Sequence, residues 1–125
     1  MSEVFKTTIT EEEQKYLFSK IDNFYTVNEK NCHNWLGEIA DGYPCIRVKF
    51  RERRMRIRVH RLIFYLLNDA IPLDPKIHVS HLCNNKICVN IEHLSYEPCV
   101  INAQRNTCFT SRKCFGHADF KNCIV

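Results

Sequence analysis

The stretch that decides the fold is Ser80–Leu94, with the sequence SHLCNNKICVNIEHL. Within it, Cys83, Cys88 and His93 follow one another with four residues between successive members. A closed structural zinc site takes four nitrogen or sulfur ligands in a tetrahedron. The stretch therefore predicts a zinc site that lacks one ligand, and the missing ligand must come from elsewhere in the chain.

The fourth ligand is predicted to be Cys32, a cysteine that precedes Trp35 and a turn. The alternative is Cys45. That residue, however, lies in a segment of alternating apolar and polar residues, where a small buried thiol is a sufficient explanation.

A second cluster, near the end of the sequence, supplies a complete set of three cysteines and one histidine within sixteen residues: Cys108, Cys114, His117 and Cys123. Residues 107–125 otherwise contain almost nothing to build a core, so we expect metal binding and folding to be coupled there. Both predicted sites are closed by four protein ligands and leave no open position, so both zinc ions are expected to be structural rather than catalytic.

The chain has 125 residues and eight cysteines. Its length suits one domain, but the core is marginal for a second half rich in Cys, His and Asn. Residues 1–13 are acidic and polar, without the basic and apolar segments of a secretion signal. We therefore expect an intracellular, reducing compartment, the nucleus in a eukaryote, where such cysteines bind metal rather than form disulfides. No apolar run approaches the ~18 residues that cross a membrane.

The sequence predicts an α+β fold. Thr10 and Glu13 form a capping-box pattern, and Pro98 suits the first turn of a helix. The expected elements are a helix at 11–22, a hairpin at 45–59, a short buried helix at 62–67, a strand at 77–82 and a helix from 98 to about 106. The single domain, 1–125, is thus divided into an N-terminal helical part (1–30), the hairpin (45–59), a core with the first zinc site (76–107) and the second zinc site (108–123).

The hairpin is expected to have one apolar and one basic face, because Ile46, Val48 and Phe50 alternate with basic residues. Such a concentration of positive charge on one small element favours a polyanionic partner, and a two-stranded ribbon fits the major groove of double-stranded DNA. The predicted DNA-binding residues are Arg47, Lys49, Arg51, Arg53, Arg54, Arg56 and Arg58.

The Ser80–Leu94 stretch, together with Asn102 and the downstream segment Arg105-Asn106-Thr107-Cys108, closely resembles the His-Cys box homing endonucleases. The resemblance extends from about Cys32 to Cys123. It implies the ββα-metal core of the His-Me finger nucleases: a strand ending at His81, a zinc-held loop, a short strand near Leu94 and a helix that carries Asn102.

The resemblance also implies that His81 is a general base and that Asn102 binds one catalytic Mg²⁺ or another divalent cation. A neutral imidazole can take a proton from water near neutral pH, and an amide oxygen is a suitable magnesium ligand. The alternative for His81 is a zinc ligand or a buried structural histidine, and for Asn102 simple surface polarity. His60 and His78 have no assigned partner.

The resemblance further implies an arginine near the scissile phosphate. One candidate is Arg105, one helical turn beyond Asn102. The others are in the hairpin, and the sequence does not choose among Arg51, Arg53, Arg54 and Arg56.

The leading hypothesis is that the protein is a metal-dependent endonuclease of the site-specific homing type. Such an enzyme would cut double-stranded DNA and leave 5′-phosphate and 3′-hydroxyl ends. The alternatives are a non-catalytic zinc-stabilised DNA-binding module, a zinc-stabilised protein adaptor and a nonspecific or defence nuclease. A homodimer is possible. The best-known member of the resembling family is a dimer whose extended C-terminal tails reach across to the partner. This sequence ends at Val125, so a dimer would need another interface and a monomer would favour nicking.

Overall fold

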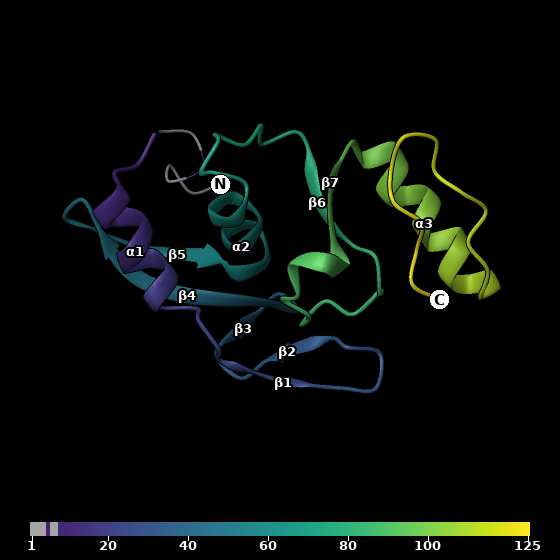
Figure 1. The fold of residues 1–125 in the computed structure, drawn as a ribbon, viewed down its shortest axis with the longest axis horizontal. Coiled ribbons are helices and arrows are strands. Elements are labelled where there is room, and N and C mark those ends of the chain that lie inside the picture. The colour runs from purple at the N-terminus through teal and green to yellow at the C-terminus, as the bar shows by residue number, and fades with distance from the viewer. Residues whose placement is uncertain (1–4, 6–7) are drawn as a thin grey trace.

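The computed structural model describes residues 5 and 8–125, so the beginning of the predicted 1–30 segment lies outside the described residues. Figure 1 shows α1, β4, β5 and α2 at one end of the molecule, the β6–β7 pair in the middle and α3 at the other end. The elements are α1 (Glu11–Ser19), β1 (Tyr25–Val27), β2 (His33–Trp35), β3 (Ile39–Ala40), β4 (Tyr43–Phe50), β5 (Arg53–Arg58), α2 (Val59–Leu67), β6 (His78–His81), the 3-10 turn η2 (Ile91–His93), β7 (Leu94–Glu97) and α3 (Cys99–Ser111).

Helix α1 begins with the predicted capping box. The Thr10 hydroxyl accepts a hydrogen bond from the Glu13 amide, and the Glu13 carboxylate accepts one from the Thr10 amide. The helix ends at Ser19 rather than at Asp22, because the amides of Lys20 and Ile21 bond carbonyls three residues earlier and tighten the last turn.

Strands β4 and β5 form the predicted antiparallel hairpin, which begins at Tyr43, two residues before the expected start. Its turn consists of Arg51 and Glu52, both in the left-handed conformation with φ of 49° and 66°. Two consecutive residues with positive φ form a type I′ turn, whose twist matches that of the two strands. The apolar side of the hairpin, represented by Val48 and Ile57, is buried.

Helix α2 follows β5 without a loop and packs against both hairpin strands. It therefore starts at Val59, earlier than the predicted 62. It ends before Asp69 and Ala70, which are left-handed with φ of 57° and 52°. The main core lies around this helix and includes Leu17, Trp35, Val48, Ile57, Val59, Leu62, Tyr65, Val79 and Leu94.

The second half of the described chain is a hairpin followed by a helix. Strand β6 pairs antiparallel with β7, with His78 opposite Glu97 and His81 opposite Leu94. Pro98 is the N-cap of α3 rather than a residue of its first turn, and α3 continues past the predicted end at Asn106 to Ser111. This β–loop–β–α order is the one that the resemblance implies, so the predicted α+β fold class is confirmed. Among the described residues, no helix is long and apolar enough to cross a membrane.

Candidate metal centres and active site

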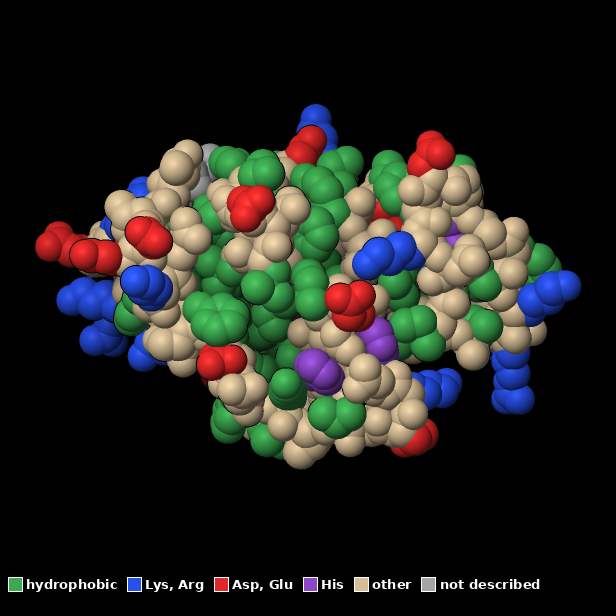
Figure 2. Space-filling model, viewed as in Figure 1, with side chains coloured by type: hydrophobic (Ala, Val, Ile, Leu, Met, Phe, Trp, Pro, Cys, Tyr) green, Lys and Arg blue, Asp and Glu red, His purple; other side chains and the backbone are tan. Residues whose placement is uncertain are grey.

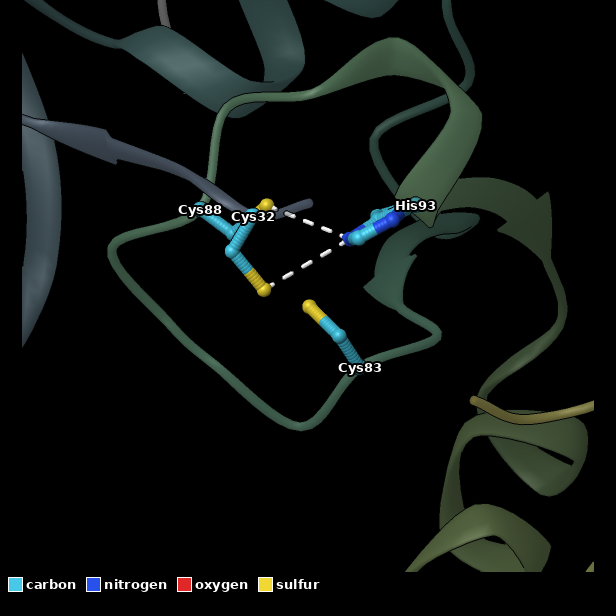
Figure 3. Close-up of side chains that lie close together, drawn as sticks. All are labelled: Cys32, Cys83, Cys88 and His93. Carbon is cyan, nitrogen blue, oxygen red and sulfur yellow. Dashed lines mark hydrogen bonds between the residues drawn. The ribbon is translucent and has the colours of Figure 1, made fainter. Parts of the chain in front are cut away.

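The first Cys/His cluster consists of Cys32, Cys83, Cys88 and His93, whose ligand atoms all lie within 4.8 Å of one another. All four residues are buried, and Figure 3 shows their side chains converging on a common point. The His93 Nδ1 atom is 3.6 Å from the Cys32 sulfur and 3.5 Å from the Cys88 sulfur. In a zinc tetrahedron with ordinary bond lengths, the distance between a sulfur and a nitrogen ligand is about 3.5 Å. The cluster therefore fits zinc.

Cys32 reaches this cluster because strand β2 is attached to the loop between β6 and η2. The Trp35 amide donates to the Ile87 carbonyl at 3.0 Å, and the Val89 amide donates to the His33 carbonyl at 2.8 Å. The Asn90 side chain adds a hydrogen bond to the Asn31 carbonyl at 2.8 Å. These bonds place a residue from the first third of the chain beside the three local ligands.

Cys45, the alternative ligand, lies elsewhere. Its thiol donates a hydrogen bond to the Glu38 carboxylate at 3.0 Å. Burial, followed by the contact with Glu38, raises the pKa of Cys45 to about 11. The thiol is therefore neutral and engaged, and the structure brings Cys32 rather than Cys45 to the cluster.

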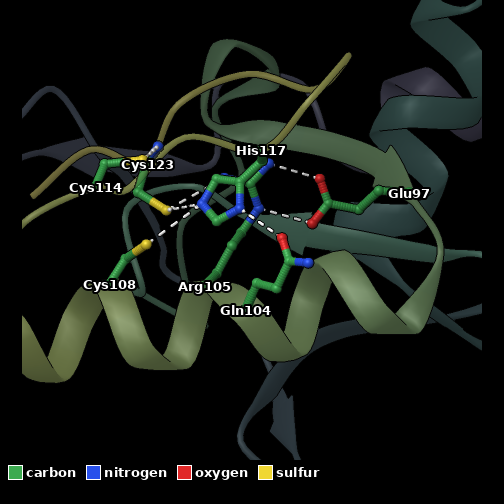
Figure 4. Close-up of polar contacts among 7 residues, drawn as sticks. All are labelled: Glu97, Gln104, Arg105, Cys108, Cys114, His117 and Cys123. Carbon is green, nitrogen blue, oxygen red and sulfur yellow. Dashed lines mark hydrogen bonds and ion pairs between the residues drawn. The ribbon is translucent and has the colours of Figure 1, made fainter.

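The second cluster consists of Cys108, Cys114, His117 and Cys123, whose ligand atoms also lie within 4.8 Å of one another. Cys108 lies in the last turns of α3, and the following segment folds back along the helix (Figures 1 and 4). The His117 Nε2 atom is 3.4 Å from the Cys108 sulfur and 3.2 Å from the Cys123 sulfur. The other ring nitrogen of His117 is 3.1 Å from the Gln104 side-chain oxygen, which fixes the ring for binding metal through Nε2.

The two clusters are connected by one short segment. Cys123 belongs to the second cluster, and the next residue, Ile124, packs against the cysteines of the first. The Ile124 amide also donates a hydrogen bond to the Leu82 carbonyl at 2.7 Å. None of the eight cysteines of the chain is in a disulfide. The two sets of ligands predicted from the sequence are therefore the sets that the fold assembles.

Arg105 does not point toward a possible substrate. Its guanidinium is buried and donates to both carboxylate oxygens of Glu97, at 2.7 Å each, and to the Cys123 sulfur at 3.2 Å (Figure 4). Burial by itself favours the neutral acid, but Arg105, together with the hydroxyls of Ser95 and Ser80, holds the pKa of Glu97 below its ordinary value. The hydrogen bonds of Arg105 are therefore made within the protein, where this arginine holds α3 against β7, and the geometry does not favour the predicted phosphate contact.

His81 ends β6 and is separate from the zinc ligands. Its Nε2 atom is 3.0 Å from the main-chain carbonyl of Cys88. A carbonyl only accepts hydrogen bonds, so Nε2 carries the proton and Nδ1 is the basic nitrogen. Burial lowers the pKa of His81, although the Cys88 carbonyl opposes this effect. The ring is therefore neutral at pH 7, held by the backbone of a zinc ligand.

The His81 ring belongs to a group of rings that sequence reasoning missed. The centroid of His81 is 4.9 Å from that of His60 and 6.1 Å from that of Tyr43. The Arg58 guanidinium lies 4.6 Å above the Tyr43 ring, and the Lys86 ammonium lies 5.3 Å from it. Burial first, then His81 and the nearby arginines, lowers the pKa of His60 well below its ordinary value. No spacing in the sequence links these residues.

Asn102 lies in the first turns of α3 and is half-buried. Its amide nitrogen is 3.3 Å from the Nδ1 atom of His78, an exposed residue at the start of β6. Helix α3 contacts β6, so Asn102 and His81 come from two adjacent elements. The contact with His78 was not predicted.

The register of β4 and β5 defines the basic face of the hairpin. Arg47 is opposite Arg56, Lys49 is opposite Arg54, and Arg58 is opposite Cys45. The basic face therefore consists of five exposed residues: Arg47, Lys49, Arg54, Arg56 and Arg58. Figure 2 shows lysine and arginine side chains projecting at the end of the molecule where β4 and β5 turn.

Two arginines predicted to bind DNA are not on the basic face. Arg51 is in the turn, where its guanidinium donates to the Glu13 carboxylate at 2.8 and 3.0 Å and to the Thr8 carbonyl at 3.1 Å. Arg53 is opposite Phe50 and so lies in the apolar row. The two-residue turn explains both positions, because it fixes the register of β5 against β4. In that register Arg54, Arg56 and Arg58 lie on the same side as Arg47, and Arg53 lies on the other side.

A pocket of about 380 Å³ continues from the basic face toward α2 and is lined in part by Arg56, Arg58 and Arg61. Arg61 is anchored by a hydrogen bond to the Ile77 carbonyl at 3.0 Å, and burial lowers its pKa. Both Arg58 and Arg61 act electrostatically on His60, whose ring is tilted by 35° against that of His81. Sequence reasoning assigned no role to Arg61.

The fold and the two clusters define a class of protein: a small α+β domain of the His-Me finger type, stabilised by zinc. The chain matches the family model described as the zinc-binding loop region of homing endonuclease over residues 33–123, and it belongs to this family. No curated protein and no solved structure matched the chain. Family membership indicates a nuclease or DNA-binding role.

Proposed function

We propose that the protein is a metal-dependent endonuclease that cuts double-stranded DNA at specific sites. The observation that carries this proposal is the geometry of His81: its Nε2 lies 3.0 Å from the Cys88 carbonyl, which leaves Nδ1 as the basic nitrogen, and burial favours the neutral ring. A base of this kind takes a proton from water and generates the nucleophile that attacks a phosphodiester.

Asn102 is proposed to bind the divalent cation. Its amide oxygen suits Mg²⁺, which binds few protein ligands and keeps several waters, and the half-buried position of Asn102 on α3 leaves room for such waters. When bound, the cation supplies positive charge to the scissile phosphate and the leaving 3′-oxygen. Attack by water at phosphorus, with the 3′-oxygen leaving, gives 5′-phosphate and 3′-hydroxyl ends.

DNA is proposed to lie along the basic face, whose five cations are spaced on a two-stranded ribbon. Arg47, Lys49, Arg54 and Arg56 line a groove on this face, and such a ribbon fits the major groove, where arginine can bond a guanine edge. At the α2 end, the charges of Arg58 and Arg61 act on His60, whose ring centroid lies 4.9 Å from that of His81. We therefore assign the phosphate-binding arginine to Arg58 or Arg61 in place of Arg105.

The test is cleavage of supercoiled plasmid and of a randomised duplex library by zinc-loaded protein in Mg²⁺, followed by sequencing of the ends. His81→Ala should reduce the cleavage rate by about 10²- to 10⁴-fold with DNA affinity within about twofold. His81→Gln keeps an N–H for the Cys88 carbonyl but supplies no base, so it should be equally inactive. Normal cleavage by His81→Gln, with two zinc ions bound, would exclude His81 as the base.

The second candidate is a non-catalytic DNA-binding module, which the basic face alone would support. Tight DNA binding by the wild-type protein without breaks would favour it. Breaks without sequence preference would instead favour a degradative or defensive nuclease. Paired, staggered breaks would indicate two active sites and hence a homodimer.

We further propose a reducing intracellular compartment, nuclear in a eukaryote, because eight cysteines outside disulfides are compatible with it.

A further inference from the structure

We infer that His78 is a second protein ligand of the divalent cation at Asn102, so that the catalytic metal site combines an imidazole nitrogen with an amide oxygen. This inference rests on the proposed function and extends it by naming a residue and a metal preference. Its starting point is the contact in which the Asn102 amide nitrogen lies 3.3 Å from Nδ1 of His78.

The geometry of the contact suits a metal. The two ends of a side-chain amide occupy equivalent positions, and a half turn about the last bond exchanges nitrogen for oxygen. The Asn102 oxygen would then lie about as far from His78 Nδ1 as the nitrogen now does. Adjacent ligands of an octahedral cation with bonds of about 2.1 Å are about 3 Å apart. The two side chains therefore have the separation of neighbouring ligands around one ion.

Both side chains are held by rigid elements. His78 is opposite Glu97 in the β6–β7 register, and the Glu97 carboxylate is fixed by two hydrogen bonds from Arg105 of α3. The buried pair of Glu97 and Arg105 thus fixes the position of α3 on the β6–β7 hairpin and, with it, the distance between Asn102 and His78. A preformed pair of ligands loses little freedom when it binds an ion.

The surroundings leave the remaining coordination positions open. His78 is exposed and Asn102 is half-buried, so water and a phosphate oxygen can reach an ion between them. The two Cys/His clusters each already have four candidate ligands, so neither competes for His78. Its Nε2 atom remains available to solvent while Nδ1 faces Asn102.

The chemistry of the pair predicts a metal preference. Mg²⁺ favours oxygen ligands, whereas imidazole suits transition metals, whose affinities rise from Mn²⁺ toward Cu²⁺. A site with one imidazole and one amide should therefore bind Mn²⁺ more tightly than Mg²⁺. Replacing His78 should weaken Mn²⁺ binding more than Mg²⁺ binding.

The experiment is an NMR titration of the full-length, zinc-loaded protein with substoichiometric Mn²⁺, in which the paramagnetic ion broadens nearby resonances. The ring protons of His78 and the side-chain amide of Asn102 should broaden first. The ring of His33, which packs on Tyr25 away from α3, is the internal control and should stay sharp. Equal broadening of His33 and His78 would overturn the inference.

Variants separate this inference from the proposed function. In a competition measured by the electron paramagnetic resonance of free Mn²⁺, His78→Ala should weaken Mn²⁺ binding about tenfold or more, with a smaller effect on Mg²⁺, and Asn102→Ala should weaken both. If His78→Ala binds Mn²⁺ within twofold of the wild type, His78 is not a ligand, while cleavage dependent on His81 and Asn102 would leave the proposed function standing. If the wild type binds Mn²⁺ through His78 but cuts no DNA, the proposed function fails and the metal site remains.

Discussion

Cys32 and Cys45 are both buried cysteines, but their surroundings give them different chemistry. Cys32 faces two thiols and an imidazole, whereas the Cys45 thiol donates a hydrogen bond to the Glu38 carboxylate and has its pKa raised to about 11. A zinc ligand must be a thiolate. The first prediction is that Cys45→Ser keeps two zinc ions per chain and that Cys32→Ser keeps one, as measured by elemental analysis of purified protein. Loss of a zinc ion in Cys45→Ser would contradict the ligand set.

At the scale of single residues, prediction from sequence succeeded where the signal is local. The ligands Cys83, Cys88 and His93 lie within one loop, so their spacing alone reveals the site. Cys32 was harder, because it joins them only through the docking of β2. The ion pair of Arg105 was not predicted, because its direction depends on Glu97, a buried partner on β7 that no spacing identifies. Tyr43 and His60 were missed for the same reason: they meet His81 only in three dimensions.

At the scale of elements, the β4–β5 hairpin carries arginines on two different faces. Their separate effects on DNA binding can be measured. Arg56 is on the basic face, and Arg53 is in the row of Phe50. Each phosphate contact that is lost reduces the slope of log affinity against log salt by about 0.9. We expect Arg56→Gln to weaken DNA binding and reduce the slope, and the matched control Arg53→Gln to leave both nearly unchanged. A fluorescence anisotropy titration at several salt concentrations measures the slope. Equal effects of the two substitutions would show that DNA does not distinguish the two faces.

The contact between β7 and α3 depends on the ion pair of Glu97 and Arg105, whose side chains are 0% and 2% exposed. Removing one partner leaves a buried charge without compensation, which costs about 3–5 kcal/mol. Glu97→Gln should lower the free energy of unfolding by about that amount at saturating zinc, as measured by urea denaturation. The double variant Glu97→Leu/Arg105→Met should recover much of the loss. A cost below about 1 kcal/mol in Glu97→Gln would show that the pair is unimportant.

The same pair gives a direction to the pH dependence. The folded-state pKa of Glu97 lies below the ordinary value of 4.5. The stability it contributes is therefore complete above pH 4.5 and is lost as the pH falls through the lower, folded-state pKa. In Glu97→Gln this part of the acid destabilisation should be absent when urea unfolding is compared at a series of pH values from above 4.5 down through the folded-state pKa of Glu97.

Prediction of the elements was also best where the pattern was strong. The capping box of α1 and the alternation in the hairpin were clear, and both elements are present. The helix ends were less accurate, because tertiary contacts and left-handed residues determine them. Strands β1 and β2 had no periodic signal, since they form a short, partly exposed ribbon whose pairing with the zinc loop supports it.

At the scale of the whole molecule, the segment after α3 depends on metal. Residues 112–125 contain no helix or long strand. The buried residues of this segment are His117 and Cys123, and both belong to the second Cys/His cluster. His117→Ala should therefore bind one zinc ion, and the amides of 112–125 should exchange rapidly with deuterium. Those of the β4–β5 hairpin should stay protected. Protected amides in 112–125 of a protein with one zinc ion would show that the segment folds without metal.

Ile124 follows directly after a ligand of one cluster and packs against the thiols of the other. An ion entering the C-terminal cluster therefore also seats the apolar residue that shields the first cluster from water. Binding at the two sites should be positively cooperative, since each ion stabilises the conformation that the other requires. When zinc is scarce, such a population divides into empty and fully loaded molecules, with few that carry a single ion. A cell that limits zinc would then reduce the number of fully folded molecules instead of producing many half-loaded ones.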